Sequence, residues 1–252
     1  MRKKPSPALA RLLLVLALLG LWEIFTRLSS VSAILIAPPS AIFWQMVQIL
    51  TRTSNVPDFY VNAGVTIGEI LIAYGLAAVF GVLTGLAVAS SKVIGDAFEP
   101  ILLVLYAVPK IILYPVFVLT IGTGPATKIV FGVFVGIFVI IFNTAAGLRQ
   151  VEPNYVRLGH SLGFGKANIF FKVELPAAAQ TILAGLRLGF GYTIIGVLTG
   201  ELLLVNAGLG YLIDWASVNY YTAQLYALIV VTLAVGVVAN YIVGRFERRW
   251  VR

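Results

Sequence analysis

Ionisable residues inside long apolar runs are the first candidates for chemistry in this sequence, because a charge in a bilayer needs a partner or a water-filled cavity. Lys110 follows Pro109 in one such run, and Glu201 lies near the end of another. A lysine that faces a pathway would favour an anionic or carbonyl-bearing solute; alternatively, it reaches toward water or pairs with Glu99 or Glu69. For Glu201 we prefer a buried, hydrogen-bonded group that fixes helix packing over a group that contacts a solute.

Uncharged polar side chains within the apolar runs are further candidates for the lining of a pathway. Beside Lys110 and Glu201 these are Tyr106, Tyr114, Asn143 and Thr193. Such residues more commonly form contacts between packed helices, so both roles stay open for each of them.

Residue types that enzymes and metal sites require are scarce. The chain has no cysteine and one histidine, His160, which excludes thiolate chemistry, disulfides and multi-histidine metal sites. Gly165-Lys166 is followed by Ala167, where a phosphate-binding P-loop needs Ser or Thr. We therefore expect no catalytic residue, no metal and no cofactor, and any ATP that drives this protein must bind to a separate subunit.

One polar, basic stretch interrupts the apolar sequence between about residues 149 and 180. Its polar side chains include Arg157, His160, Lys166, Asn168, Lys172 and Glu174. Apolar residues recur at helical spacing up to Leu175, and Pro176 is then expected to break the helix. This pattern indicates a short amphipathic segment outside the bilayer, with an apolar side available to a partner. Phe170 and Phe171 either anchor that partner or pack against the protein's own spans.

The elements that position these residues are predicted to be membrane spans. Of the 252 residues, 60% are hydrophobic and 11% are charged, whereas soluble domains are about one quarter charged. The chain is therefore predicted to be an all-α membrane protein with a single transmembrane domain over residues 1–252. Six helices are expected at about residues 9–28, 65–89, 100–121, 126–148, 181–204 and 222–243.

The sequence also predicts how two pairs of these spans are connected and where one span is irregular. Residues 90–99 are expected to form a short turn, and the polar loop 149–180 joins the fourth span to the fifth. Pro109 and Pro115 predict that the third span is kinked or locally unwound.

The distribution of charge predicts the orientation of the chain. A net charge of +8 could indicate a nucleic-acid partner, but the basic residues gather at the ends of apolar runs and form no basic face interleaved with aromatics. With the N-terminus inside, the cytoplasmic side collects Arg2, Lys3, Lys4, Arg11, Lys92, Arg149, Arg157, Lys166, Lys172, Arg245, Arg248, Arg249 and Arg252. The far side keeps Arg27, Arg52 and Lys128. Both termini and the polar loop are thus predicted to be cytoplasmic.

The polar loop resembles the EAA loop of ABC importer permeases, in which Glu-Ala-Ala, three residues, Gly and nine residues precede Ile-x-Leu-Pro. Gly163 stands at the Gly position, Val173 replaces the Ile, and Leu175-Pro176 supply the Leu-Pro. Arg157-Leu158-Gly159 replace the leading Glu-Ala-Ala. The segments GLRLGF from Gly185 and GELLLVNAGLG from Gly200, with the earlier Val108-Pro109 to Pro115 and Gly122-Thr-Gly124, are similar to the nitrate/sulfonate/taurine-type branch. The resemblance extends from about Leu35 to Arg252.

This resemblance implies a type I ABC importer (MetI-like) permease fold with a cytoplasmic coupling helix, in a bacterial-type inner membrane. It implies a permease homodimer, two cytoplasmic ATP-binding subunits and an external solute-binding protein. The solute would be small, of the nitrate, sulfonate, taurine or thiamine-precursor kind. The residues that it assigns to the ATPase-coupling loop are Arg157, Gly159, Ser161, Leu162, Gly163, Phe164, Gly165, Phe170, Val173, Leu175 and Pro176.

Two other classes of membrane protein are alternatives. A carrier driven by an ion gradient, or a channel, would need no ATPase partner. A polytopic enzyme acting on lipids would need acidic or histidine clusters near the interface, whereas the ionisable residues here are scattered.

Overall fold

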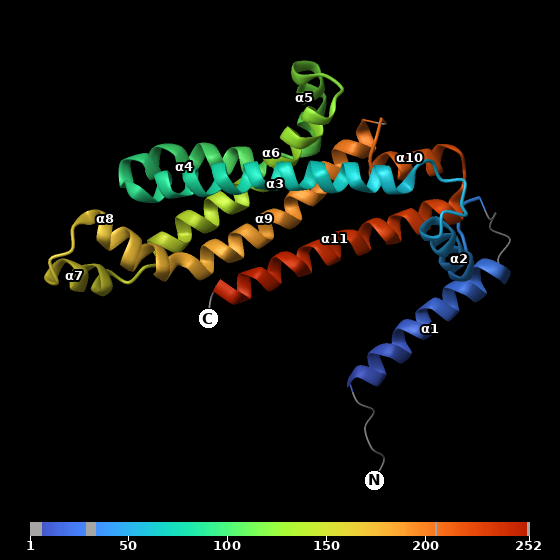
Figure 1. Ribbon diagram of the computed structural model, residues 1–252, viewed down its shortest axis with the longest axis horizontal. Coiled ribbons are helices and arrows are strands. Elements are labelled where there is room, and N and C mark those ends of the chain that lie inside the picture. The colour runs from blue at the N-terminus through green and yellow to red at the C-terminus, as the bar shows by residue number, and fades with distance from the viewer. Residues whose placement is uncertain (1–6, 29–33, 205, 251–252) are drawn as a thin grey trace, which may run out of the picture.

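The computed structural model describes residues 7–28, 34–204 and 206–250, with side chains up to residue 245. These segments are helices joined by short connections and contain no strand, so the expected all-α class is confirmed (Figure 1). The helices are α1 (Pro7–Leu28), α2 (Pro39–Leu50), α3 (Phe59–Ser90), α4 (Lys92–Ala107), the 3-10 helix η1 (Lys110–Leu113), α5 (Tyr114–Ile121), α6 (Pro125–Arg149), α7 (Pro153–Ser161), α8 (Lys166–Ile169), the π-helical turn η2 (Phe170–Glu174), α9 (Leu175–Leu203), α10 (Leu209–Val218) and α11 (Thr222–Trp250).

Within the described residues, 5 helical segments are long and apolar enough to cross a membrane. They are α1, α3, α6, the segment Lys166–Leu203 and α11. The helix α4 and the segment of η1 and α5 meet the same criteria only when taken together, and they are bent by 89° at the break between them, which is the geometry of a broken span or of a re-entrant loop. The break falls at Val108 and Pro109, as the proline predicted, because Pro109 cannot donate an N–H to the helix. The basic residues 2–4 and 252 lie outside the described residues.

The expected turn over residues 90–99 is wrong. Ser91 alone is extended, and α4 begins directly after it at Lys92. A single residue suffices because Gly95 lets α4 approach the end of α3: a Cβ built on Gly95 would lie 3.0 Å from the carbonyl oxygen of Val88. Most of the predicted cytoplasmic turn is therefore the first two turns of α4.

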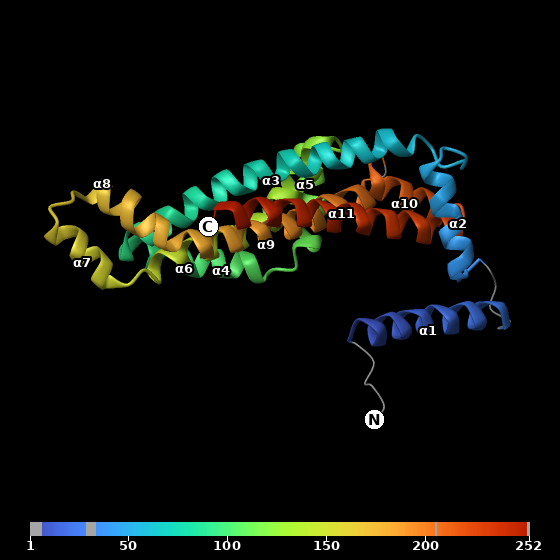
Figure 2. The same ribbon diagram turned by 60° about the horizontal axis from the view of Figure 1, so that its bottom comes forward.

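Three spans, α3, α6 and α9, pack side by side along most of their length and form the centre of the protein (Figures 1 and 2). Between α3 and α6 the close approach depends on the Gly81-x-x-x-Gly85 pair. A Cβ on Gly81 would lie 2.9 Å from Ile140 Cβ, and one on Gly85 would lie 2.6 Å from Thr144 Cβ. The backbones of these two helices are therefore nearly in contact.

The α6–α9 contact is equally close. A Cβ on Gly196 would lie 2.8 Å from Gly132 Cα, and one on Gly136 would overlap Thr193 Oγ1. Since the bilayer gives packed helices no hydrophobic driving force, van der Waals contact over this area is one of the interactions that hold them together.

The chain remains helical through Pro176, and the expected break takes the form of a bend between α8 and α9 (Figures 1 and 2). Residues Lys166–Leu203 are helical over 38 residues without an intervening loop. Pro176 lies in the first turn of α9, directly after the wider π-turn η2. The missing N–H and the ring of the proline therefore face the π-turn. A π-turn places its carbonyls differently from an α-turn, so the proline is accommodated without interrupting the helix, and the axis bends at this point.

The helices α2 and α10 and the first part of α11 attach at one end of this centre. Buried side chains of α2, α10 and α11, including Ile49, Leu212 and Leu228, form an apolar cluster there. The helix α1 lies apart from the bundle in both views (Figures 1 and 2) and has no buried residue. Its Glu23 accepts a hydrogen bond from the Ser40 N–H at the start of α2 (3.0 Å).

The packing of α3 against α6 yields a first prediction. Replacing Gly85 by Ala should lower the free energy of unfolding by about 1–3 kcal/mol, because the new methyl group must displace Thr144 or the α6 backbone. The change is measured as the thermal unfolding midpoint of the purified protein in detergent. Gly75→Ala on the same helix is the control, since nothing lies within 4 Å of its Cβ position. Equal midpoints for the two variants would contradict the close α3–α6 contact.

Candidate functional site

The predicted coupling loop is a helical hairpin that projects beyond one end of the bundle (Figures 1 and 2). Its first helix, α7, ends at Ser161, and Gly163, just beyond the C-cap Leu162, has a φ of +76°. The Gly163 N–H donates to the His160 carbonyl (3.0 Å) and the Phe164 N–H donates to the Gly159 carbonyl (3.0 Å). These two bonds form a Schellman motif, in which glycine is favoured at the left-handed position. Gly163 thus sets the reversal of the hairpin.

The two arms of the hairpin pack against each other through a small contact. Gly159 of α7 is buried, and a Cβ there would lie 3.2 Å from Ile169 Cγ1 and 3.8 Å from Val173 Cγ2. Ile169 is itself buried. The residues that replace the family's Ala and Ile, Gly159 and Val173, therefore face one another across the hairpin and hold its arms together.

The outer surface of the hairpin carries large apolar side chains. Leu162 is 63% exposed, Phe171 is 64% exposed, and Tyr155 and Leu158 are also exposed. Such side chains beyond the end of the bundle indicate a contact with a partner protein. Of the two phenylalanines, Phe170 is half-buried and Phe171 is exposed, so Phe171 is the better candidate for that contact.

The remaining coupling-loop residues of the prediction lie on or near this surface. Exposed positions are Arg157, Ser161, Gly165 and Pro176, and half-buried ones are Phe164 and Leu175. Lys172 covers the ring of Phe164, with Nζ 5.5 Å from its centroid.

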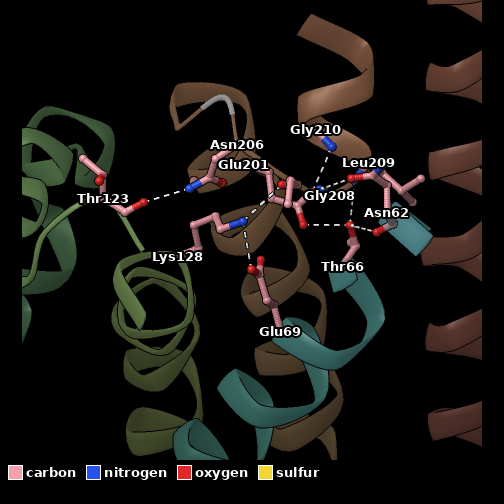
Figure 3. Close-up of polar contacts among 12 residues, drawn as sticks. Asn62, Thr66, Glu69, Thr123, Lys128, Glu201, Asn206, Gly208, Leu209 and Gly210 are labelled. Atoms are coloured by element: carbon pink, nitrogen blue, oxygen red, sulfur yellow. Dashed lines mark hydrogen bonds and ion pairs between the residues drawn. The ribbon is translucent and has the colours of Figure 1, made fainter. Parts of the chain in front are cut away.

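A buried polar cluster occupies the opposite end of the bundle, where α3, α6 and α9 meet α10 (Figure 3). Its centre is the carboxylate of Glu201, which is 0% exposed. Thr66 Oγ1 of α3 donates to Glu201 Oε1 (2.7 Å), and the Gly210 N–H donates to Glu201 Oε2 (2.8 Å). A carboxylate at the N-terminus of α10 is also favoured by the helix dipole.

The turn that enters α10 is shaped around this carboxylate. Gly208 has a φ of +105°, and a Cβ there would overlap the Glu201 carboxylate. The Gly208 N–H donates to Asn62 Oδ1 (2.8 Å) and the Leu209 N–H donates to Thr66 Oγ1 (2.7 Å). Three successive N–H groups, 208 to 210, are thereby satisfied by side chains of α3 and α9 (Figure 3).

The same region holds a buried ion pair. Lys128 Nζ lies 2.8 Å from Glu69 Oε1, with the two side chains 0% and 5% exposed. Lys128 Nζ also donates to the Ala207 carbonyl (3.1 Å). Lys128 was expected on the far side of the membrane; the structure shows in addition that it is fully buried, and a buried charge is retained here because Glu69 compensates it. The position of Lys128 in the apolar run of α6 was the signal in the sequence.

The predicted pathway residues fall into two groups. Tyr114, Thr193 and Glu201 are buried within the protomer, and the Tyr114 hydroxyl donates to the Gly200 carbonyl (2.8 Å). Asn143 is half-buried and donates to the Val139 carbonyl (2.8 Å). These contacts favour packing roles.

Lys110 and Tyr106 are the accessible members of the set. Lys110 is half-exposed, donates to the Tyr106 carbonyl (2.8 Å) and lies over the rings of Tyr106 and Phe138. Its suggested partners are engaged elsewhere, Glu69 by Lys128 and Glu99 by Arg149 (2.8 Å). No carboxylate lies within 4.0 Å of Lys110 in the described part of the chain.

The sequence of this chain is similar to those of known proteins. Residues 77–252 match the family described as "Binding-protein-dependent transport system inner membrane component". The chain belongs to this family. It is 30% identical over 83% of its length to the formylaminopyrimidine transport permease of Halalkalibacterium halodurans, covering 81% of that protein. It is 27% identical over 98% of its length to the putative aliphatic sulfonates transport permease of Bacillus subtilis, covering 90% of that protein.

The permease fold is shared with a solved structure. A chain of the methionine ABC transporter MetNI, in an inward-facing conformation, superposes with a TM-score of 0.66. The match has 16% identity and covers 86% of this chain and 100% of the other. The protein is thus a multi-pass inner-membrane permease subunit of the ABC importer class, in the nitrate/sulfonate/taurine-type branch, as its motifs predicted.

The buried ion pair of this permease yields a second prediction. Lys128→Met should lower the free energy of unfolding by about 3–5 kcal/mol, because it leaves the Glu69 carboxylate buried without a counter-charge. The double variant Lys128→Met/Glu69→Gln should regain most of that loss. The thermal unfolding midpoint in detergent is measured for the single and the double variant. If the single variant is as stable as the wild type, or the double variant is no better than the single, the ion pair is not a coupled unit.

Proposed function

We propose that the α7–α8 hairpin is the site at which a cytoplasmic ATP-binding subunit drives this permease. The observation that supports this most is the set of exposed apolar side chains on the hairpin, Leu158, Leu162 and Phe171, beyond the end of the membrane bundle. The family implies ATP-binding subunits and a solute-binding protein. Because the turn at Gly163 fixes the conformation of the hairpin, the hairpin presents a defined binding surface to such a subunit.

The permease converts movement of this hairpin into movement of a span. Because residues Lys166–Leu203 are helical without an intervening loop, a displacement of α8 is passed directly to α9. ATP binding closes the two ATPase subunits, draws the hairpins of two permease copies together and rocks the spans from inward-facing to outward-facing. ATP hydrolysis resets them, and the permease itself makes or breaks no covalent bond.

The assembly is a homodimer of the permease with two ATPase subunits inside and a solute-binding protein outside. Both termini and the hairpin are cytoplasmic, in accordance with the excess of Lys and Arg at that end of the spans. The helix α1, which has no buried residue in the protomer, extends away from the bundle and is available to a second copy.

The solute is a small anion. Lys110 supports this, since it is an accessible cation at the break of a membrane span and has no carboxylate partner in the described chain. The relatives include a permease for aliphatic sulfonates. An anion could displace the weak contacts that Lys110 makes with the rings of Tyr106 and Phe138.

A substitution on the hairpin tests the coupling role. Leu162→Asn should reduce the amount of ATPase that co-purifies with the permease about tenfold or more, because truncating an apolar anchor typically costs an interface about 2 kcal/mol. Val218→Asn, which is equally exposed (63%) at the other end of the bundle, should have no effect. Retention of the ATPase by Leu162→Asn, or transport in vesicles without ATP, would contradict the proposal and favour an ion-gradient carrier.

A second substitution tests the anion pathway. In proteoliposomes holding the complete importer, Lys110→Gln should reduce uptake of a labelled alkanesulfonate about tenfold or more, since a charge-assisted hydrogen bond contributes about 1.5–3 kcal/mol. Lys110→Arg should retain most of the uptake. Lys92→Gln, which removes an exposed lysine at the start of α4, is the control. Undiminished uptake by Lys110→Gln would place that lysine outside the pathway.

A further inference from the structure

A cationic hollow lies between α9 and α11, away from both the hairpin and the buried polar cluster. Arg187, Tyr241, Gly244 and Arg245 line a part of about 210 Å³. A wider part of about 670 Å³ shares Arg187 and is lined further by Leu188, Gly191, Tyr192, Ile195 and Asn240. None of the roles proposed above uses these residues.

Arg187 is the unusual residue in this hollow. It lies within an apolar membrane span, its side chain is exposed, and no carboxylate with a described side chain lies within 4.0 Å of it. A guanidinium at this depth is costly without an anionic partner. A Cβ on Gly244 would lie 3.2 Å from Arg187 Cζ and Nε, so the guanidinium lies directly against the α11 backbone. The missing side chain of Gly244 makes room for it.

The surroundings of Arg187 add further positive charge and a free acceptor. Arg245 lines the same hollow, and the last eight residues of the chain contain four arginines and one glutamate. Asn240 Oδ1 is buried and has no hydrogen-bond partner among the described residues. A ligand that combines a negative charge with a hydroxyl donor would satisfy both the arginines and the asparagine.

We propose that this hollow binds the headgroup of an anionic phospholipid of the cytoplasmic leaflet. Arg187 and Arg245 contact its phosphate, and Asn240 accepts from a headgroup hydroxyl such as those of phosphatidylglycerol. The leaflet rests on the orientation proposed above, in which the C-terminal end of α11 is cytoplasmic. Basic hollows between spans on that side are a recognised type of lipid headgroup site.

Two features favour a membrane lipid over a dissolved anion. Tyr241 is exposed beside the arginines, as expected for an aromatic residue at the membrane interface. Leu188 and Ile195 are exposed further along α9, where they offer an apolar surface to an acyl chain. Because α9 carries the hairpin, a lipid bound here joins the moving helix to α11.

The test measures binding of phosphatidylglycerol to the purified, delipidated complex in detergent. Lipid retained by the protein is counted by native mass spectrometry during a titration, with phosphatidylcholine as the comparison. Arg187→Gln should weaken phosphatidylglycerol binding about fivefold and Arg187→Gln/Arg245→Gln about 25-fold, since each arginine near a charged surface contributes about 1 kcal/mol. Arg187→Lys should bind nearly as well as the wild type.

Two further arms can overturn the proposal. Arg149→Gln removes an arginine that is paired with Glu99, and an equal loss of lipid in this control would show that only general charge matters. If inorganic phosphate competes with phosphatidylglycerol at millimolar concentration, or if phosphatidylcholine binds equally well, the hollow is no anionic lipid site. These readouts are independent of ATPase co-purification, so the lipid site and the coupling role can fail separately.

Discussion

The buried carboxylate of Glu201 requires hydrogen-bond donors, and the end of the permease opposite the hairpin is built from the groups that supply them. Thr66 comes from α3, and the Gly210 N–H comes from the first turn of α10. Gly208 must lack a side chain because the carboxylate occupies that space. The ion pair of Lys128 with Glu69 adds α6 to the same arrangement. Four helices are thus tied together where no water is available to replace a lost bond.

The opposite end of the same spans is organised differently. There the hairpin packs on itself through the small contact at Gly159 and presents apolar side chains outward. One end is therefore held by buried polar bonds and the other is open to a partner. The helical segment from Lys166 to Leu203, bent between α8 and α9, joins the two ends. A force applied at the hairpin therefore acts on spans that are already tied together at their opposite ends.

Backbone features that depend on neighbouring residues could be predicted from the sequence, whereas contacts between residues far apart in the sequence could not. Gly163 at the hairpin reversal and the break at Pro109 follow from backbone rules that act within a few residues. The pairing of Lys128 with Glu69 could not be predicted, because Glu69 is far away in the sequence and nothing local identifies it as the partner. The π-turn that keeps the chain helical up to Pro176 was not predicted either, because it depends on the packing of the hairpin arms. The sulfonate-type branch and the permease fold, by contrast, were evident in ordered motifs.

The most direct test of ATP-driven coupling is the distance between the two hairpins in the complete assembly. The chain has no cysteine, so Asn154→Cys at the start of α7 would give one spin-label site per copy, and pulsed electron resonance would report the separation of the two labels. We expect the separation to shorten when a non-hydrolysed ATP analogue binds and to lengthen again on its removal. An unchanged separation in an assembly that hydrolyses ATP, or no dipolar signal between two copies, would contradict the account.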